Sequence, residues 1–518
     1  MRIVQAAIVV ALGMTPAAEA ATPCEELAAL ALPAATIDMA VRVPAGDVTL
    51  PGGQGGEGQT FAALPAFCRV AATLRPTSDS DIKIEVWLPS SGWNGKLQAV
   101  GNGGWAGSIS YGAMVTALKA GYATTSTDTG HTSPGGAFVH GHPEKLADFS
   151  WRSVHEMTVK AKAVIDAHYG QAPSRSYFNG CSTGGKQGLI EATRFPADYD
   201  GIVAGDPANL RAYRNTWQVS VINQIQKNPG GAMAREELEL LHGAVMNACD
   251  AIDGVKDGLL EDPKACSFDP ATLACTGGDA SAACLTPAQV RSAKILLSPG
   301  TVGGKAYHPG LERGSELGWS LWTSAEPSSQ QSEFFRYVVY ENPDFDWTAL
   351  DPETALPLAV EAAKADSAEA NDLGPFIERG GQIILYHGWA DPTVAAQASI
   401  NYYTAAQAST PNAKDSIRMF LVPGMGHCRG GEGATDNFDA VAALDAWVET
   451  GRAPTRVHAT NVTNGRVNRS RPLCPYPQIA TYTGTGSTDE AANFVCAALS
   501  PSAAPVQRSG HQGQSVPR

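Results

Sequence analysis

Short apolar runs typical of strands alternate with amphipathic runs typical of helices along most of the chain. Residues 82–88 alternate apolar with polar or aromatic positions, which predicts a strand. Further strand-like runs cover 96–100, 122–127, 176–178, 201–207, 382–388 and 418–422. Helix-like runs cover 151–169, 186–193 and 438–448, the last with Phe438, Val441, Leu444 and Trp447 on one face. This alternation predicts an α/β fold.

The alternation is interrupted in the middle of the chain. Residues 208–372 are rich in Trp, Phe and Tyr and hold four cysteines. We interpret them as a lid inserted into the core, and expect most of these aromatic side chains to form the lid's own core. One or two of them are expected to line a pocket for a flat group. The expected organisation is a core over 21–207 and 373–500, a lid over 208–372, and a disordered tail over 501–518.

The first twenty residues have the features of a secretory signal. Arg2 precedes a mostly apolar run over 3–14, and the small-x-small motif Ala18-Glu19-Ala20 predicts cleavage after Ala20. The alternative is a membrane anchor, but the apolar run is too short to span a bilayer. No later run approaches eighteen uninterrupted apolar residues. We therefore expect an exported protein, either periplasmic or secreted.

Composition supports export and narrows the choice of partners. The chain of 518 residues has ten cysteines and no Cys-x-x-Cys pair, which favours disulfides over a zinc or redox site. Cys24 and Cys68 border an Ala-, Pro- and Gly-rich N-terminal segment and are expected to pair. A formal net charge of -14 argues against nucleic acid or anionic lipid as a partner.

The candidate nucleophile is Ser182, at the centre of Gly180-Cys181-Ser182-Thr183-Gly184. An apolar run precedes this Gly-x-Ser-x-Gly motif and a helix-compatible run follows it. Strand, sharp turn and helix in this order predict a nucleophile elbow, which exposes the serine hydroxyl above the sheet. The alternative is an ordinary Gly-rich turn, because glycine makes up 54 of the 518 residues.

Two later residues complete a possible catalytic triad. Asp391 follows the predicted strand 382–388, and His427 lies on a Gly-flanked loop after the predicted strand 418–422. The order Ser, Asp, His is that of the α/β-hydrolases. An oxyanion hole is expected from the backbone N–H groups of Thr183 and of Gly103 or Gly104, although those glycines could also form a plain turn.

These motifs resemble the tannase and feruloyl esterase family, which includes mono(2-hydroxyethyl) terephthalate hydrolase. The resemblance rests on Gly180-Cys181-Ser182-Thr183-Gly184-Gly185, Gly388-Trp389-Ala390-Asp391 and Gly426-His427-Cys428, and it extends over nearly the whole mature chain. It implies an α/β-hydrolase core in which Cys181 and Cys428, beside nucleophile and base, form a disulfide. Disulfide geometry is compatible with that pairing if Ser182 and His427 are within hydrogen-bond reach. The alternatives are a nucleophilic Cys181 or a Cys-His metal site.

The resemblance also implies three further disulfides and a structural calcium ion. The disulfides are Cys249 with Cys266, Cys275 with Cys284, and Cys474 with Cys496. The implied calcium ligands are the side chains of Asp250, Asp253 and Asp257 and the carbonyls of Val255 and Leu259. Closely spaced carboxylates suit calcium, but the spacing is not that of an EF-hand. The alternative is a solvated acidic loop.

The sequence therefore predicts a serine esterase that acts on a small phenolic or aromatic ester. The resemblance implies a feruloyl esterase that cleaves hydroxycinnamoyl esters through an acyl-enzyme, and the alternatives are galloyl esters or a terephthalate monoester. A terephthalate monoester would need a cation for its free carboxylate, for which Arg336 is a candidate, although it could equally be a solvated helix residue. A catalytically silent binding protein on a hydrolase scaffold is the alternative of a different class. The intact triad argues against it.

Overall fold

The computed structural model describes most of the chain, namely residues 21–51, 58–276, 283–324, 329–369 and 373–498. The expected signal sequence over 1–20 and the expected tail over 501–518 lie outside the described residues. Within the described part, no helix combines the length and the apolar character that crossing a bilayer would require.

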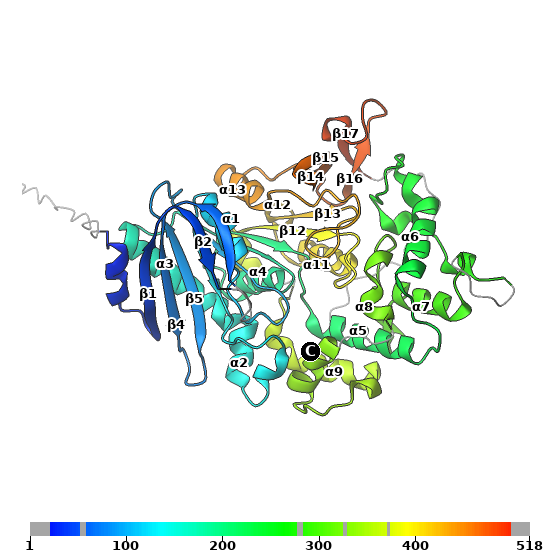
Figure 1. Cartoon of the computed structure of the whole chain (residues 1–518), viewed down its shortest axis with the longest axis horizontal. Helices are drawn as coiled ribbons and strands as arrows, with labels where there is room; N and C mark the ends of the chain where they lie inside the picture. Colours follow the sequence, from blue (N-terminus) through cyan, green and yellow to red (C-terminus); the bar gives the residue numbers. More distant parts are fainter. Residues whose placement is uncertain (1–20, 52–57, 277–282, 325–328, 370–372, 499–518) are drawn as a thin grey trace, which may run out of the picture.

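One nine-stranded mixed sheet runs through the middle of the molecule (Figure 1). In spatial order its strands are β1 (Ala35–Val43), β4 (Phe67–Leu74), β5 (Ile82–Pro89), β7 (Ala123–Thr127), β6 (Lys96–Val100), β8 (Arg175–Cys181), β9 (Gly201–Gly205), β12 (Gln382–Gly388) and β13 (Ile417–Val422). The first four pair antiparallel. From β7 onward all neighbours are parallel. Every strand predicted from the sequence belongs to this sheet, and the α/β prediction is confirmed.

The central strands are buried on both faces because their alternate side chains enter different cores. Phe178 and Ile202 pack into one core, with side chains from α3 (Ser153–Tyr169), α4 (Thr183–Arg194) and α11 (Ala396–Ser409). Tyr177 and Val203 pack into the other, against α13 (Ala440–Thr450). A third cluster lies under α1 (Tyr111–Lys119). Successive strand residues point to opposite faces, so each apolar run serves two layers of helices.

Two helices begin later than their hydrophobic patterns suggest. The run over 438–448 becomes a helix only at Ala440, because the Asp439 side chain accepts a hydrogen bond from the Ala442 N–H at 2.8 Å and caps the helix. Phe438 therefore lies outside the helix and packs edge-on against Tyr386. The predicted helix over 151–169 begins as a π-helical turn over Asp148–Arg152 before α3.

The described part of 208–372 contributes no strand to the nine-stranded sheet. It holds α5 (Arg211–Gln226), α6 (Arg235–Cys249), α7 (Pro287–Leu297), α8 (Ser320–Thr323), α9 (Pro352–Ala362) and the small sheet of β10 (Gly300–Val302) and β11 (Lys305–His308). These helices gather on the side of the molecule opposite β1, β4 and β5 (Figure 1). Trp217, Trp319 and Trp322 are buried together with leucines of α6 and α7 in a separate core.

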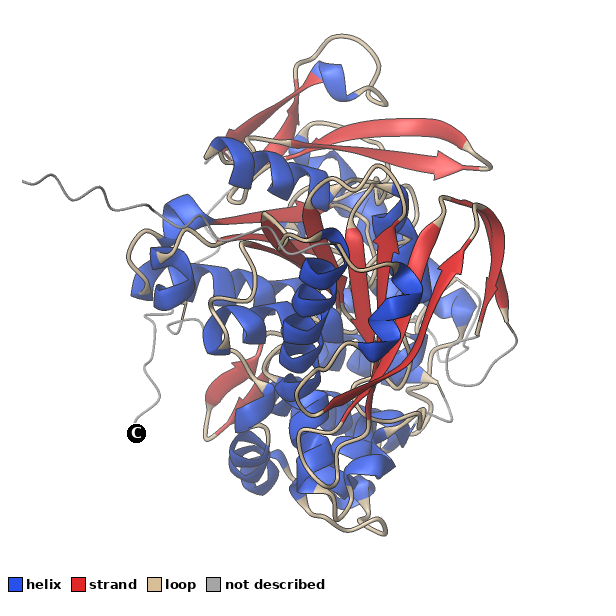
Figure 2. Ribbon diagram, turned by 90° about the vertical axis from the view of Figure 1, so that its left-hand side faces the viewer, coloured by secondary structure: helices blue, strands red, loops and turns tan. Residues whose placement is uncertain are grey.

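Smaller elements surround the core. Three two-stranded sheets pair β2 (Gly46–Leu50) with β3 (Gln59–Leu64), β14 (Val457–Thr463) with β15 (Arg466–Leu473), and β16 (Gln478–Tyr482) with β17 (Phe494–Ala498). The short helices are α2 (Pro143–Ala147), α10 (Gly374–Glu378) and α12 (Ala413–Ser416). Strands β14 to β17 form the top of the molecule in both overall views (Figures 1 and 2).

We expect Gly180→Ala to destabilise the protein, because the new Cβ would lie 2.5 Å from the backbone carbonyl carbon of Gly184. Neither backbone can move without shifting β8 against α4, and such overpacking costs about 1–3 kcal/mol. Gly243→Ala in α6 is the matched control, because its Cβ would meet no heavy atom within 4 Å. Urea denaturation should show a loss for the first variant and no loss for the second, and equal stabilities would contradict the tight elbow.

Candidate active site

Ser182 lies at the turn between β8 and α4, with a backbone conformation that is rare for residues other than glycine. Its φ is 62° and its ψ is -121°. Two hydrogen bonds hold it there: the Ser182 N–H donates to the Gly205 carbonyl at 3.0 Å, and the Ala208 N–H donates to the Ser182 carbonyl at 2.9 Å. A Cβ at Gly185 would lie only 2.4 Å from the Gly205 carbonyl oxygen. The neighbouring strand therefore fixes the strained turn.

Asp391 and His427 meet above the ends of β12 and β13. The His427 Nδ1–H donates to Asp391 Oδ2 at 2.6 Å. The other oxygen, Oδ1, accepts from the Thr393 N–H at 2.7 Å, the Thr393 hydroxyl at 2.8 Å and the Val394 N–H at 2.9 Å. Because Nδ1 is engaged by the carboxylate, Nε2 of His427 is left to accept a proton.

Asp391 is held as a carboxylate although it is buried. Burial by itself would raise its pKa, but the imidazoles of His427 and His387 outweigh burial through their charge and hydrogen bonds. Together they hold the pKa of Asp391 well below its usual range. A permanently ionised Asp391 can stabilise the imidazolium that forms when His427 accepts a proton.

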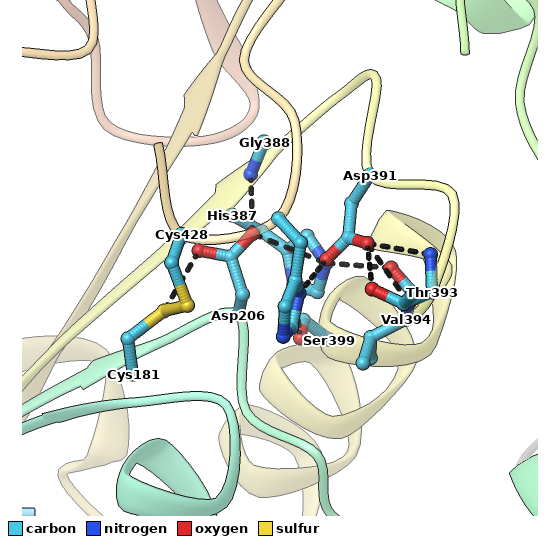
Figure 3. Close-up of a disulfide and its surroundings, with 10 residues drawn as sticks. Cys181, Asp206, His387, Gly388, Asp391, Thr393, Val394, Ser399 and Cys428 are labelled. Atoms are coloured by element: carbon cyan, nitrogen blue, oxygen red, sulfur yellow. Dashed lines mark hydrogen bonds and ion pairs between the residues drawn. A yellow bond between two sulfur atoms is a disulfide. The ribbon is translucent and has the colours of Figure 1, made fainter. Parts of the chain in front are cut away.

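A disulfide joins the neighbours of the nucleophile and the base (Figure 3). Cys181 and Cys428 are bonded, with their Cα atoms 5.9 Å apart. This excludes Cys181 as a nucleophile and as a thiolate metal ligand, because both sulfurs are in the bond. The Ser182 hydroxyl makes no hydrogen bond to another described residue, and catalytic contacts commonly tighten only when substrate binds. The disulfide nevertheless keeps Ser182 and His427 on adjoining loops.

All ten cysteines are paired as the sequence analysis expects. The other four disulfides are Cys24–Cys68, Cys249–Cys266, Cys275–Cys284 and Cys474–Cys496. The first joins the N-terminal segment to β4, and the second and third lie within the lid segment. Five disulfides in one chain are typical of an oxidising compartment.

The loop after β6 lies beside the start of α4, as an oxyanion hole requires. The Thr183 hydroxyl donates to the Gly104 carbonyl at 2.7 Å, and the Gly184 N–H donates to the Asn102 carbonyl at 2.7 Å. The N–H groups of Gly103, Gly104 and Thr183 donate to no residue in the described ranges. Gly104 has a φ of 57°, which favours glycine there. These three amides are available to an oxyanion.

A cavity of about 290 Å³ opens beside His427, between the core and the lid segment. Its apolar lining consists of Met246, Leu259, Leu260, Leu317, Leu321, Trp389 and Pro392. Trp322 of α8 supports one wall, because its indole N–H donates to the Pro392 carbonyl at 2.8 Å. Such a cavity suits a group of about one aromatic ring.

Arg336 does not line this cavity. It lies in a π-helical turn over Phe335–Val339, where its Nε–H donates to the Phe345 carbonyl at 3.4 Å. The arginine in the cavity wall is Arg313, whose Nε–H donates to the Phe268 carbonyl at 2.8 Å. Sequence reasoning had no means of choosing between the two, because spacing along a lid segment does not define which side chains reach a cavity.

Two buried residues of the site were missed by sequence reasoning. His387 contacts Asp391, and Asp206 lies beside both His387 and the disulfide (Figure 3). Each stands at the carboxyl end of a parallel strand, His387 within the end of β12 and Asp206 directly after β9. Because α/β sheets place ligand-binding groups at this edge, the position of a polar residue after each apolar run was the available signal.

Several of the oxygen atoms expected to bind calcium lie together in the loop over 250–259. Asp250 Oδ1 accepts from the N–H groups of Asp257 and Gly258 at 3.1 and 3.0 Å, and Asp253 Oδ1 accepts from the Val255 N–H at 2.9 Å. The carbonyls of Val255 and Leu259 accept no hydrogen bond from the described residues, although both residues are buried. Those are the two carbonyls expected to bind the ion.

The charges in this loop are compatible with a cation. Burial raises the pKa of Asp253 to about 6, and the nearby carboxylates of Asp257 and Asp250 add to that effect. The Asp257 carboxylate also contacts Arg471. In the described chain, the clusters of His, Cys, Asp or Glu with ligand atoms all within 4.8 Å of one another lie elsewhere. An ion here would therefore depend on carbonyl oxygens as well as carboxylates.

Comparisons with known proteins agree with this geometry. A family model described as tannase and feruloyl esterase matches residues 68–497. The chain is 37% identical to an uncharacterized esterase of Xanthomonas campestris, with 92% of each chain covered. It is 33% identical to a probable feruloyl esterase B-2 of Aspergillus terreus, with 89% of this chain and 92% of the relative covered.

Solved structures show the same fold. Feruloyl esterase B from Aspergillus oryzae superimposes with a TM-score of 0.85 at 30% identity, covering 92% of this chain and 99% of that one. A tannin acyl hydrolase from Aspergillus niger gives a TM-score of 0.74 at 22% identity, covering 93% and 94%. The fold is accordingly that of the α/β-hydrolases, with a mixed central sheet.

We expect the double substitution Cys181→Ala, Cys428→Ala to lower both stability and activity, because the disulfide joins the loops of Ser182 and His427 across a sequence separation of 247. Loss of a native disulfide typically costs about 2–5 kcal/mol. The matched control is Cys275→Ala, Cys284→Ala, which removes a disulfide of separation 9 within the lid segment. Turnover per folded molecule should fall at least about 10-fold only in the first variant, since a 1 Å misplacement can cost about 100-fold. Equal turnover in the two variants would contradict the positioning role.

Proposed function

Because the chain belongs to the tannase and feruloyl esterase family and is an esterase, we propose that it is an exported serine hydrolase that cleaves hydroxycinnamoyl esters. The observation that supports this most directly is the 2.6 Å hydrogen bond from His427 to Asp391 beside a serine elbow held by a disulfide. The five disulfides support export, since they persist in oxidising compartments.

In the proposed acylation step, Ser182 Oγ attacks the carbonyl carbon of the ester while His427 Nε2 takes the hydroxyl proton. The oxyanion of the tetrahedral intermediate accepts hydrogen bonds from the N–H groups of Thr183 and of Gly103 or Gly104. Each such donor contributes about 3 kcal/mol of transition-state stabilisation. The C–O bond to the alcohol then breaks, and the leaving oxygen takes the proton from His427.

Deacylation reverses these roles. A water molecule gives a proton to His427 Nε2 and attacks the acyl carbon, which forms a second oxyanion at the same N–H groups. Its collapse breaks the bond to Ser182 Oγ, which takes back the proton from His427 and releases the carboxylic acid. Asp391 keeps its negative charge throughout and orients the imidazole by the hydrogen bond to Nδ1.

The substrate class is proposed from the cavity and the named relatives. The cavity beside His427 is mostly apolar and of a size for one aromatic group. Relatives with more than 30% identity are named probable feruloyl esterases. A galloyl ester would fit the same family, whereas a terephthalate monoester would need a cation at its free carboxylate. Arg313 lies in the cavity wall and Arg336 does not, so we propose no carboxylate contact for Arg336.

We propose further that a calcium ion stabilises the loop over 250–259. Asp250, Asp253 and Asp257 would supply carboxylates, and Val255 and Leu259 would supply the carbonyls that otherwise lack a donor in the described chain. The ion would neutralise the like charges that raise the pKa of Asp253. The loop borders the cavity through Gly258 and Leu259, so its order bears on the shape of the site.

Hydrolysis of methyl ferulate, methyl gallate, a terephthalate monoester and p-nitrophenyl acetate will test the proposed reaction. We expect methyl ferulate to be the best of the three aromatic esters, and Ser182→Ala to lower kcat by about 10⁶-fold, as for loss of a catalytic serine elsewhere. Ser409→Ala, at the exposed end of α11, is the control and should retain full activity. A protein that cleaves none of these esters would falsify the proposal and favour the silent binding protein.

Chelation will test the calcium ion by thermal denaturation, without reference to activity. We expect EGTA to lower Tm by several degrees, because an ion that binds only the folded state stabilises it by about 2.7 kcal/mol at 100 times its Kd. Calcium and not magnesium should restore the original Tm. In Asp253→Asn the effect of EGTA should be much smaller, since one carboxylate ligand is lost. An unchanged Tm with EGTA, together with no calcium by elemental analysis, would rule the ion out.

A further inference from the structure

A second imidazole lies directly behind the carboxylate of the proposed triad. His387, near the end of β12, is fully buried, and its Nε2 is 2.8 Å from the Val394 carbonyl oxygen and 3.2 Å from Asp391 Oδ2 (Figure 3). A carbonyl oxygen can only accept a hydrogen bond, so Nε2 must carry a hydrogen. The same nitrogen lies within ion-pair distance of Asp391 Oδ2, which therefore contacts two imidazoles.

A second carboxylate faces the same nitrogen of His387, Nε2. Asp206, directly after β9, is fully buried, and its Oδ1 accepts from the Gly388 N–H at 3.0 Å and lies 3.6 Å from His387 Nε2. Its Oδ2 is 3.4 Å from Cys181 Sγ. That sulfur carries no hydrogen because it is in the disulfide, so this is a packing contact. Asp206 thus touches the disulfide and the loop that leads to Asp391.

Charge balance favours a protonated His387 between the two carboxylates. Two buried carboxylates without a cation would be costly. His387 Nδ1 is 2.8 Å from the Ser399 hydroxyl, which can accept a hydrogen bond from a protonated ring. Burial alone would lower the pKa of His387, but the charge of Asp206 and the hydrogen bond to Asp391 raise it to about 8. Burial raises the pKa of Asp206 to about 6.

We propose that Asp206 and His387 form a second acid–imidazole pair, which positions Asp391 and offsets its charge so that His427 works as a base at neutral pH. Asp206 Oδ1 and Asp391 Oδ2 both face Nε2 of His387, and Asp206 and Asp391 also lie close to His427, so these four residues form one cluster next to Ser182. In this arrangement Asp206 and His387 are positioning residues: His387 acts through Asp391, and Asp206 also lies close enough to His427 for their charges to interact. The inference rests on the proposed function, because it assigns roles within the same triad.

The cluster of Asp206, His387, Asp391 and His427 makes a specific prediction for the pH dependence of activity. The charged groups that act on His387 are Asp206 from the loop after β9 and Asp391 from the loop after β12. Asp391 in turn faces His427, and Arg214 of α5 lies near enough to interact with it. Without the His387 cation, the charge of Asp391 acts more strongly on His427. The acid limb of kcat/KM, which reports on the catalytic base, is then expected to move to higher pH.

His387→Gln is the decisive variant, because the glutamine amide can still donate to the Val394 carbonyl but carries no charge. We expect kcat to fall about 10- to 100-fold, the loss typical of removing a group that orients a ligand of a catalytic metal. KM should stay within about twofold of the value for the unmodified protein. The acid limb should shift upward. His155→Gln is the matched control, since His155 of α3 makes a comparable 2.6 Å contact with Asp198, away from the triad. It should leave kcat and the pH profile unchanged.

Asp206→Asn provides a second variant should His387→Gln fold poorly. The asparagine can still accept from the Gly388 N–H, but the charge that keeps His387 protonated is gone. NMR titration of histidine side chains should then show His387 losing its proton at lower pH than in the unmodified protein. If both variants retain the original acid limb, or if activity falls only in proportion to the folded fraction, the pair has no positioning role.

A substrate-independent measurement separates this inference from the proposed function. Fluorophosphonates label activated serines whatever the natural ester is. The labelling rate of Ser182 therefore reports on its activation by the cluster and not on the substrate class. Labelling without cleavage of any aromatic ester would contradict the proposed substrate class, and the pH profile of labelling in His387→Gln would still test the pair. If Ser182 is not labelled at all, both the triad and the pair are wrong.

Discussion

The disulfide between Cys181 and Cys428 is the constraint on which the site depends. Ser182 and His427, the proposed nucleophile and base, lie on loops that leave different strands, and the whole lid segment separates them in the chain. A hydrogen bond between side chains could not by itself hold two such loops, because it contributes only about 1 kcal/mol in water. A covalent bond between their immediate neighbours holds them whatever the lid does. The strained backbone of Ser182, which hydrogen bonds to the neighbouring strand segment hold, lies directly next to this covalent link.

Electrostatic interactions also hold the side chains of this site in place. Asp391 accepts hydrogen bonds at both oxygens, from Thr393 and Val394 at Oδ1 and from His427 at Oδ2, and His387 contacts Oδ2 at 3.2 Å. A carboxylate saturated in this way stays ionised in a buried position, where an unpaired charge would be too costly. The orientation of His427 is then set by a group that cannot rotate away. Preorganised charge of this kind needs little rearrangement during the reaction.

The lid segment also supports the catalytic loop from outside. Gln218 of α5 donates to the Thr393 carbonyl at 2.8 Å, and Trp322 of α8 donates to the Pro392 carbonyl. The segment is anchored in turn by a buried ion cluster, in which Asp366 contacts both Lys186 of α4 and Arg211 of α5. Burial lowers the pKa of Lys186 to about 8, which shows how far this cluster is removed from water. The lid segment therefore contacts the loop that carries Asp391, so we expect a change in the packing of the lid to alter the position of Asp391.

What the sequence determined by itself is what depends on local pattern. The apolar runs located seven strands of the sheet but missed β1 and β4, and the glycines around Ser182 indicated its sharp turn. The positions of Asp391 and His427 after strand ends suggested that they lie near Ser182. Helix starts were less certain, because a capping residue such as Asp439 can override the apolar pattern around Phe438. The aromatic residues of the lid could be counted, but the sequence did not show which of them line a pocket. Arg336 was a candidate for the pocket, whereas the arginine in the cavity wall is Arg313.

Only the tertiary structure determined which charged groups, distant from one another in the chain, interact in the site. Asp206 and His387 are unremarkable in the sequence, since a polar residue after an apolar run has many possible surroundings. Parallel pairing of β9 with β12 brings both to one edge of the sheet, where burial and the carboxylate of Asp391 give them their properties. Hydrogen-bond partners and desolvation depend on contacts across the fold and not on neighbours in the chain, so local pattern could not supply them.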